Sequence, residues 1–446
     1  MSNTELNKTL EKLSSISLCA KGDATFKFTS LAHHLNVAFL KDCYNHLDRN
    51  KAVGVDSVSW EEYGNSLDEN LNRLVYKLKN KTYEPLPSRR VYIPKGNNEV
   101  RPLGISAIEN KIVESGIMRI LSSIYEVDFY SFSYGFRPNK SAHQALKGIG
   151  DSINFKPVNH VIEADIKGFF DNVDHDILLG FLRNRIKDSS LLSLIEKFLK
   201  AGYVDAEQLI KTERGTPQGS ILSPMLSNIF LHYVLDDWFN NVVQKHVTGY
   251  AELVRYADDF IILVQSENDA KRILKALQNR FAKYKLQLHP DKTSIFGFGR
   301  NEKRNSIKEK RRANTFDFLG FTQYCDTTRG GHFKVGRKTS AKKFRAKIKG
   351  LNLWLKSVRN IMLTKDWWKT LRAKLRGHYE YYGISENYRS INKFYKLAIK
   401  LAKKWMNRRS QKKAMSWEKM SKYLSLYPLP KPRIRHNFYA TTYSVS

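Results

Sequence analysis

The sequence is poor in cysteine and contains no cluster of cysteine and histidine. Its three cysteines, Cys19, Cys43 and Cys325, lie far apart. An odd number of isolated cysteines fits neither a disulfide framework nor a paired-cysteine zinc site, so we expect free thiols. The twelve histidines include no HExxH motif, which excludes the helical zinc site of that type.

Membrane-spanning and secretory patterns are also missing. No run of about 18 apolar residues occurs, the length that a bilayer-spanning helix needs. The first residues, MSNTELNKTLEKLSS, lack the apolar core of a signal peptide. We therefore expect a cytoplasmic protein without a membrane partner.

Acidic residues are scarce relative to basic ones. The chain has 43 Asp+Glu against 76 Lys+Arg, a formal charge of +33, which indicates a polyanionic partner, with nucleic acid as the leading candidate. The excess is uneven, because residues 326–446 carry 31 Lys+Arg and 5 Asp+Glu. Helices built for solubility usually mix both signs, so we expect this segment to bind nucleic acid.

Length and periodicity predict an α+β body followed by a basic helical domain. A chain of 446 residues is expected to form two or three domains. The charged stretch 300–314 is expected to be an exposed loop, 315–326 a strand pair, and the helical domain to begin near Ser340. Trp354 and Trp405 fall on apolar stripes and are expected to be ordinary core. Helical patterns cover 31–47, 66–80, 108–126 and 223–243, and strand patterns cover 88–94, 159–166, 253–264 and 292–298.

Three aspartates stand where apolar strands end. Asp165 follows the apolar run in HVIEADIKGFFDN, and Asp258 and Asp259 interrupt LVRYADDFIILV as the expected tip of a hairpin. A single Asp at a strand end is usually a turn former, but neighbouring carboxylates between buried strands repel one another unless a cation lies there. Hard oxygen ligands on rigid strands suit phosphoryl transfer with two metal ions about 3.5–4 Å apart.

Seven ordered motifs carry a family resemblance. On these motifs the chain resembles a bacterial group II intron-encoded reverse transcriptase/maturase over nearly its whole length. The motifs are YIPKGNNEVRPLGI (92–105), YSFSYGFRPNKSAHQAL (130–146), EADIKGFFDNVDHDIL (163–178), RGTPQGSILSPMLSNIFLHYVLDDWF (214–239), RYADDF (255–260), LQLHPDKT (286–293) and FDFLGF (316–321).

The resemblance implies a right-hand polymerase of the α+β class, with fingers and palm on an antiparallel sheet and an all-α thumb behind them. Residues 1–90 would form the N-terminal extension and the start of the fingers, and 91–325 the reverse transcriptase fingers and palm. A connecting strand and turn (326–339) would lead to the basic thumb or maturase domain (340–446).

The resemblance also assigns the acidic residues and the cofactor. Asp165 and Asp258 would bind two Mg²⁺ ions directly, Ile166 would offer a backbone carbonyl, and Asp259 would complete the acidic cluster. These assignments make the expected enzyme an RNA-directed DNA polymerase.

Further residues of the motifs would bind the incoming nucleotide. Lys95 and Arg101 resemble the fingers residues that clamp the triphosphate, and their charges suit an anion. Phe170 would crowd a ribose 2′-hydroxyl, Gln218 would lie beside the nucleotide and template base, and Lys292 would act as general acid toward pyrophosphate. Without the resemblance, the basic residues would be solvated hairpin or turn positions and Phe170 a core residue.

The expected partners are intron RNA, template RNA, a DNA primer or target, and deoxynucleoside triphosphates. In the basic domain, Lys403, Lys404, Arg408 and Arg409 are candidate RNA-binding residues. The protein would assist splicing and mobility of its intron, and it would be associated with the bacterial nucleoid.

The sequence departs from the family pattern at two places. Gly219-Ser220 stands where the family usually has Gly-Gly, and no cysteine-pair region for an appended endonuclease follows the basic domain. Three alternatives remain open: a domesticated or defence-associated reverse transcriptase without an intron, a splicing-only maturase with an inactive polymerase, and an RNA-directed RNA polymerase. The oligomeric state is also open.

Overall fold

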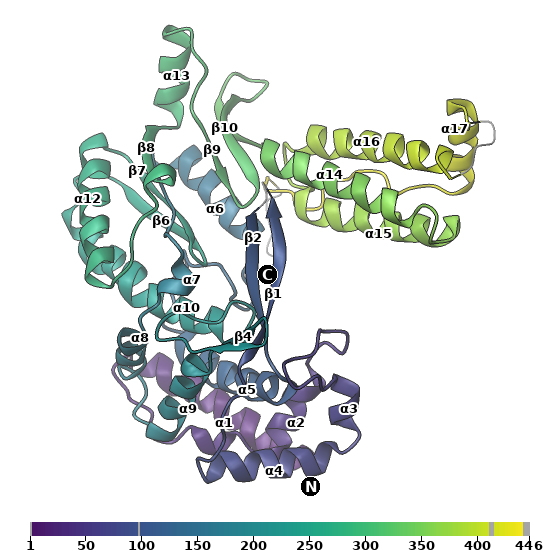
Figure 1. Ribbon diagram of the computed structural model, residues 1–446. Helices are drawn as coiled ribbons and strands as arrows, with labels where there is room; N and C mark the ends of the chain where they lie inside the picture. Colours follow the sequence, from purple (N-terminus) through teal and green to yellow (C-terminus); the bar gives the residue numbers. More distant parts are fainter. Residues whose placement is uncertain (1, 97–98, 410–413, 440–446) are drawn as a thin grey trace. The chain divides into compact units, whose positions relative to one another are not determined.

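The computed structural model describes residues 2–96, 99–409 and 414–439 and has a mixed α+β fold (Figure 1). It divides into two compact units, one made of Met1–Ser141 and Ile162–Ile295, the other of Ala142–Val161 and Phe296–Ser446. The predicted α+β class, with antiparallel strands and a helical C-terminal region, is confirmed. Among the described residues, no helix has both the length and the apolar character that crossing a membrane requires.

The first unit begins with helices that pack on α5 (Ile108–Tyr125). This helix is buried along most of its length because α1 (Ser2–Gly22), α2 (Val37–Asn45) and α10 (Ser223–Leu231) contact it. The helix predicted over 31–47 is shorter, since the Asn36 side chain accepts a hydrogen bond from Phe39 N and starts α2 there. Shorter neighbouring helices are η1 (Ala32–His34), α3 (Trp60–Gly64) and α4 (Leu67–Lys79).

Two sheets follow in the chain. The strand order of the first is β2-β1-β4-β5 and that of the second is β6-β7-β3-β8, with β1–β2 and β6–β7 as antiparallel hairpins. The strand patterns of the sequence are thereby confirmed. The strands are β1 (Ser88–Gly96), β2 (Glu99–Ile105), β3 (His160–Ala164), β4 (Tyr203–Asp205), β5 (Gln208–Ile210), β6 (Ala251–Tyr256), β7 (Asp259–Val264) and β8 (Ser294–Gly297).

Helices enclose the buried strands of the first unit. Five of the six residues of β7 are buried, and α12 (Glu267–Lys283) contacts that strand with its apolar face. The other helices here are α7 (Phe169–Asn172), α8 (His175–Leu182), α9 (Ser189–Lys200), α11 (Gln244–His246) and the 3₁₀ turn η4 (Pro290–Lys292).

The helix predicted over 223–243 changes its winding partway along. After α10 the chain continues as two π-helical stretches, η2 (His232–Asp236) and η3 (Phe239–Val243). A π-helical turn inserts an extra residue into the helical period, so the side chains after it rotate to new directions. Asp236 is the last residue of the first of these stretches.

The second unit combines a three-stranded sheet with long helices (Figure 1). The sheet order is β11-β10-β9, and α6 (Ala142–Phe155) contacts β11. Its strands are β9 (Thr315–Phe318), β10 (Phe321–Thr327) and β11 (Phe333–Thr339), and its helices are α13 (Arg300–Lys308), α14 (Ala341–Val358), α15 (Thr364–Tyr382), α16 (Tyr388–Asn407) and α17 (Trp417–Leu426).

Two expectations for this unit have different outcomes. Ser340 caps α14 by accepting from Lys343 N, so the predicted helical start is confirmed. The predicted loop over 300–314 is wrong, because α13 forms there. Its buried Glu302 accepts hydrogen bonds from Arg311 and from Asn314 N, and these contacts close a helix that lacks an apolar stripe.

Candidate active site

Asp165 and Asp258 approach one another at the ends of adjacent strands. Asp165 directly follows β3, and Asp258 lies in the turn between β6 and β7, where β7 is the neighbour of β3. Burial raises the pKa of Asp258, and the negative charge of Asp165 raises it further. Two carboxylates that repel one another in a half-buried position favour binding of a cation.

The turn that carries Asp258 is tight and supported from behind. Tyr256 pairs with Asp259 across the hairpin, which leaves Ala257 and Asp258 as the turn, and Ala257 adopts a φ of 57°. Gly135 lies against this turn, and a Cβ atom there would stand 2.2 Å from Ala257 N. Only glycine at position 135 therefore lets its segment of the chain pack against the turn that carries Asp258.

A buried ion pair holds the same turn in place. Arg255 and Asp236 are both 0% exposed, and Arg255 Nε donates to Asp236 Oδ1 at 2.7 Å. Arg255 NH1 donates to the Ala257 carbonyl at 3.1 Å and to Asn228 Oδ1 at 2.9 Å. Asn228 in turn donates to the Gly135 carbonyl at 2.8 Å. The guanidinium thus fixes both the turn and the segment behind it.

Sequence reasoning did not identify Asp236, Asn228 or Gly135 as parts of the site. Asp236 lies in a π-helical stretch, so the ordinary helical period does not predict its direction. The available signal was chemical. Arg255 directly follows the apolar Leu253 and Val254 in its strand, and a buried arginine needs a carboxylate partner.

Lys292, which the family resemblance implicated in the site, lies beside Asp165. The chain after β3 runs along residues 287–289, where His289 N donates to the Asp165 carbonyl at 2.7 Å and Lys167 N to the Gln287 carbonyl at 2.8 Å. This pairing brings the turn η4 next to Asp165, and Lys292 forms an ion pair with its carboxylate. The ammonium group of Lys292 thus supplies a positive charge beside Asp165.

Asp259 and Ile166 differ in their surroundings. Ile166 is buried beside Asp165, whereas Asp259 is exposed at the start of β7. Over the part of the chain that the structure describes, no three His, Cys, Asp or Glu side chains stand together as a ready metal cluster. The structure therefore brings Asp165 and Asp258 close enough for their charges to interact.

Phe170 and Gln218 line one hollow of the first unit. The hollow has a volume of about 520 Å³, and Phe170, Asp171, Pro217 and Gln218 form part of its wall. Gln218 Nε2 donates to Asp171 Oδ1 at 3.3 Å, and Thr216 N donates to the Phe170 carbonyl at 2.7 Å. The loop after β5 is therefore tied to the α7 turn that follows Asp165.

Gly219 permits a close approach between this loop and β2. Gly104 N donates to the Gln218 carbonyl at 2.6 Å, and a Cβ on Gly219 would stand 2.4 Å from the Gly104 carbonyl oxygen. Gly219 also has a φ of 110°. Ser220 is not among the residues with positive φ, so serine fits where the family usually has a second glycine.

The fully buried Glu114 holds the same loop. It accepts hydrogen bonds from Ile221 N at 2.8 Å and from Ser106 Oγ at 3.0 Å. Burial raises the pKa of Glu114, and the hydroxyl of Ser220 opposes that shift. Ser220, which departs from the family pattern, thus interacts with the carboxylate of Glu114, a residue that the sequence did not indicate.

The two basic residues of the β1–β2 hairpin are described to different degrees. Arg101 pairs with Ile93 across the hairpin, and its positive charge opposes the rise in the pKa of Asp258. Lys95 belongs to β1, but its side chain lies outside the described part of the structure. Arg101 is therefore one of the positive charges that act on Asp258.

The four basic candidates of the second unit gather at the end of α16. Lys403 lies 4.8 Å from the ring centre of Trp417, while Lys404 and Arg408 lie 5.1 and 5.4 Å from that of Trp405. Arg409 NH1 donates to the Met362 carbonyl at 3.2 Å. Trp405 is 4% exposed, which confirms it as core, and Trp354 is half-buried.

Comparisons with known proteins agree with this geometry. The family described as reverse transcriptase (RNA-dependent DNA polymerase) matches residues 93–323. The group II intron-encoded protein LtrA of Lactococcus lactis subsp. cremoris is 30% identical, over 79% of this chain and 69% of that protein. Protein YkfC of Escherichia coli (strain K12) is 34% identical, over 54% of this chain and 71% of that protein.

One plant relative is named as an intron maturase. The nuclear intron maturase 1, mitochondrial, of Arabidopsis thaliana is 32% identical over 21% of this chain and 13% of that protein. Reverse transcriptases act on nucleic acid and nucleotides and use divalent metal ions, and a pair of neighbouring carboxylates supplies ligands of the kind such ions prefer. The chain belongs to the group II intron-encoded reverse transcriptases and maturases, and it is an RNA-directed DNA polymerase.

Proposed function

We propose that the chain copies RNA into DNA at a site where Asp165 and Asp258 bind two Mg²⁺ ions, with Asp259 and the Ile166 carbonyl as further oxygen ligands. The observation that carries the proposal is the approach of Asp165 and Asp258 at adjacent strand ends, with Lys292 as the nearby cation. Bound Mg²⁺ would activate the primer 3′-hydroxyl and stabilise the leaving pyrophosphate.

Residues around the aspartates bind and orient the nucleotide in this proposal. Arg101 and Lys95 hold the triphosphate, and a guanidinium is suited to bidentate phosphate contacts. Gln218 lies beside the nucleotide and the template base, while Phe170 blocks a ribose 2′-hydroxyl by bulk. Lys292 breaks its ion pair with Asp165 and then donates a proton to the leaving pyrophosphate. The hollow shared by Phe170 and Gln218 supports their joint role.

The proposal extends to the architecture and partners. Residues 1–90 would be the N-terminal extension and start of the fingers, 91–325 fingers and palm, 326–339 a connection, and 340–446 the thumb of a right-hand polymerase. The thumb would bind intron RNA through Lys403, Lys404, Arg408 and Arg409 and so assist splicing. Relatives whose names describe them as intron proteins favour this function over a reverse transcriptase that has left its intron.

Primer extension on an RNA template with magnesium tests the metal assignment. Asp165→Asn and Asp258→Asn should each lower the extension rate by about a thousandfold or more, because each removes a ligand charge. Asp176→Asn, which changes an exposed carboxylate on α8, is the matched control and should leave the rate unchanged. Activity within tenfold of wild type for folded Asp258→Asn would contradict the two-metal assignment.

A further inference from the structure

The segment 300–312, which we call the α13 arm, is strongly cationic and ordered. It consists of α13 and the turn that follows, and it contains seven Lys or Arg residues and two Glu residues. In Figure 1, α13 projects on the side of its sheet that faces away from α14–α16.

Both carboxylates of the arm are occupied by a single arginine. Arg311 forms ion pairs of 2.5 Å with Glu302 and with Glu309. The Arg311 guanidinium and the Asn314 backbone N–H lower the pKa of Glu302, which is 5% exposed. The two glutamates therefore stabilise the fold of the arm through Arg311. They do not neutralise the charge of its other lysines and arginines.

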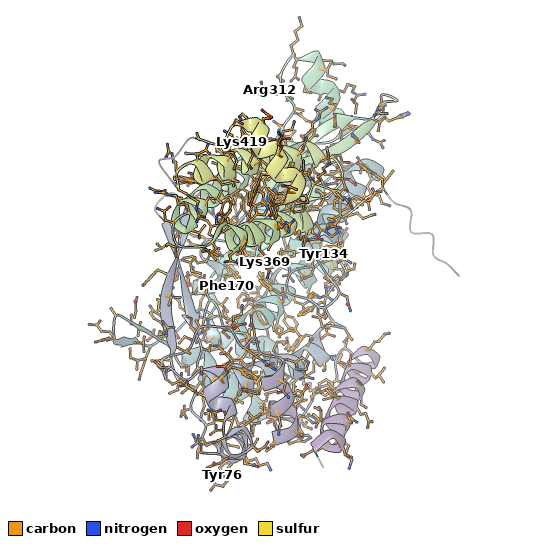
Figure 2. All side chains as sticks on the ribbon, turned by 90° about the vertical axis from the view of Figure 1, so that its right-hand side faces the viewer. Tyr76, Tyr134, Phe170, Arg312, Lys369 and Lys419 are labelled. Carbon is orange, nitrogen blue, oxygen red and sulfur yellow. The ribbon has the colours of Figure 1, made fainter. Side chains whose placement is uncertain are left out.

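The remaining cations point to solvent without a carboxylate partner. Arg304, Lys308, Lys310 and Arg312 are exposed, and within the described ranges none of them forms an ion pair. Figure 2 labels Arg312 at the turn after α13. Arg304 and Lys308 are four residues apart on the helix, a spacing at which like charges repel and destabilise the helix.

Helix α12 shows the pattern expected of a merely solvated charged helix. There Lys271 pairs with Glu267 at 2.7 Å and Arg272 with Asp269 at 3.3 Å, and acidic residues lie in its first turn. Mixed signs of this kind stabilise an exposed helix without a partner. In the α13 arm both carboxylates pair with the single Arg311, so four exposed cations have no such partner among the described residues and solubility does not explain their charge.

The arm is also anchored at its base. Asn301 Nδ2 donates to Asn159 Oδ1 at 2.7 Å, Arg300 donates to the Asn154 carbonyl, and Cys325 Sγ donates to the Gly299 carbonyl at 3.6 Å. Helix α13 packs on β10. Its cations are thus presented on a fixed support, which lowers the entropic cost of binding an anionic surface.

We propose that the α13 arm contacts the phosphate backbone of folded RNA. It would be a second RNA-binding surface, in addition to the proposed surface of α14–α17. The polyanionic partner required by the charge is the nucleic acid on which this family acts, and phosphates match a surface of exposed, unpaired cations. The inference rests on the proposed binding of intron RNA, and it adds a surface that the family motifs do not include.

Salt-dependent binding of a folded group II intron transcript tests the proposal. The full chain carrying Arg304→Gln, Lys308→Gln and Arg312→Gln should bind about tenfold more weakly near 0.15 M salt. Its log–log salt slope should flatten by roughly 2, since each lost phosphate contact releases about one fewer counterion. The matched control is Lys271→Gln, Lys275→Gln and Lys283→Gln on α12, which removes equal charge from exposed positions and should change neither quantity.

Each outcome decides the question once thermal melting shows the variants folded. An unchanged slope in the arm variant would overturn the proposal, as would an equal loss in the α12 control, which would show an effect of net charge alone. Weaker binding of duplex DNA with unchanged RNA binding would assign the arm to DNA instead. Failure of the metal assignment is separate, because primer extension by Asp258→Asn reports on it without involving the arm.

Discussion

In the first unit Arg255 and Asp236 form a fully buried ion pair, whereas in the second unit Lys404 and Arg408 are exposed to solvent beside Trp405. Arg185 repeats the first pattern, since it is 2% exposed and pairs with Asp128 at 3.1 Å. A buried pair loses hydration and gains only if its geometry is fixed. Exposed cations keep their hydration and remain available to an anionic partner.

The difference suggests a division of labour for charge. In the first unit Arg255 holds the turn that carries Asp258, and in the proposed function the exposed cations at the end of α16 contact phosphates. Changes to charge should therefore affect stability and rate in the first unit and affinity in the second. Three further predictions test this contrast.

The largest effect is expected from breaking the buried pair. Arg255→Met leaves Asp236 as an uncompensated buried charge, so the free energy of unfolding should fall by about 3–5 kcal/mol. Primer extension should fall as well, because Arg255 also holds the Ala257 carbonyl. Urea denaturation measures the stability. The exposed pair of α12 is the control, and Lys271→Met should cost less than about 1 kcal/mol.

A double variant separates positioning from stability. Arg255→Met combined with Asp236→Leu removes both charges and should recover part of the lost stability, since an apolar pair can replace a buried ion pair. Extension should stay low if the guanidinium positions the turn of Asp258. Recovery of both stability and rate would show that the pair is structural only.

An intermediate effect is expected from Phe170, an uncharged residue that lines the hollow of the first unit. Phe170→Val should raise the incorporation of ribonucleotides relative to deoxynucleotides by about tenfold or more, because rejection by bulk depends on side-chain size. Single-nucleotide kinetics with matched dNTP and rNTP measures the ratio. Phe169→Leu is the matched control, since Phe169 is buried against Phe170 and should affect stability without changing the ratio. A constant ratio in Phe170→Val would leave that ring with a packing role.

The smallest effect is expected from the end of α16. Replacing Lys403, Lys404, Arg408 and Arg409 by Gln should weaken binding of intron RNA and of unrelated RNA to similar degrees, because phosphate contacts carry no sequence information. The log–log salt slope should flatten by roughly 2–3. The loss of exposed cation–π contacts should cost only about 0.5–1 kcal/mol each, which thermal melting checks. An unchanged slope in the folded variant would show that these cations form a solvated face.

The sequence predicts those features that depend on local patterns. Two apolar runs interrupted by Asp258-Asp259 predicted the β6–β7 hairpin and its tip, and the apolar run before Asp165 predicted β3. Motif order added Lys292, which the structure places beside Asp165. In each case the side chains involved belong to a strand or turn whose period is simple.

Features that depend on distant partners were not predictable in this way. Asp236, at the end of a π-helical stretch, meets Arg255 across 19 residues, and Glu114 meets Ile221 across 107 residues. Helix α13 was expected to be a loop because it has no apolar stripe, and its helix is closed by Glu302 and Arg311 instead. Local periodicity contains no information on such pairs.

The membership of α6 in the second unit has a consequence for the order of folding. Arg337 NH2 donates to the Leu146 carbonyl across 191 residues, so α6 leaves the ribosome long before the strand that covers it. At about 5–20 residues per second, the delay is roughly 10–40 s. Ile162–Ile295 is synthesised entirely within that interval, so the first unit can complete its core while the buried face of α6 still lacks its partners. Translation speed between these two points therefore sets how long that apolar helix stays uncovered.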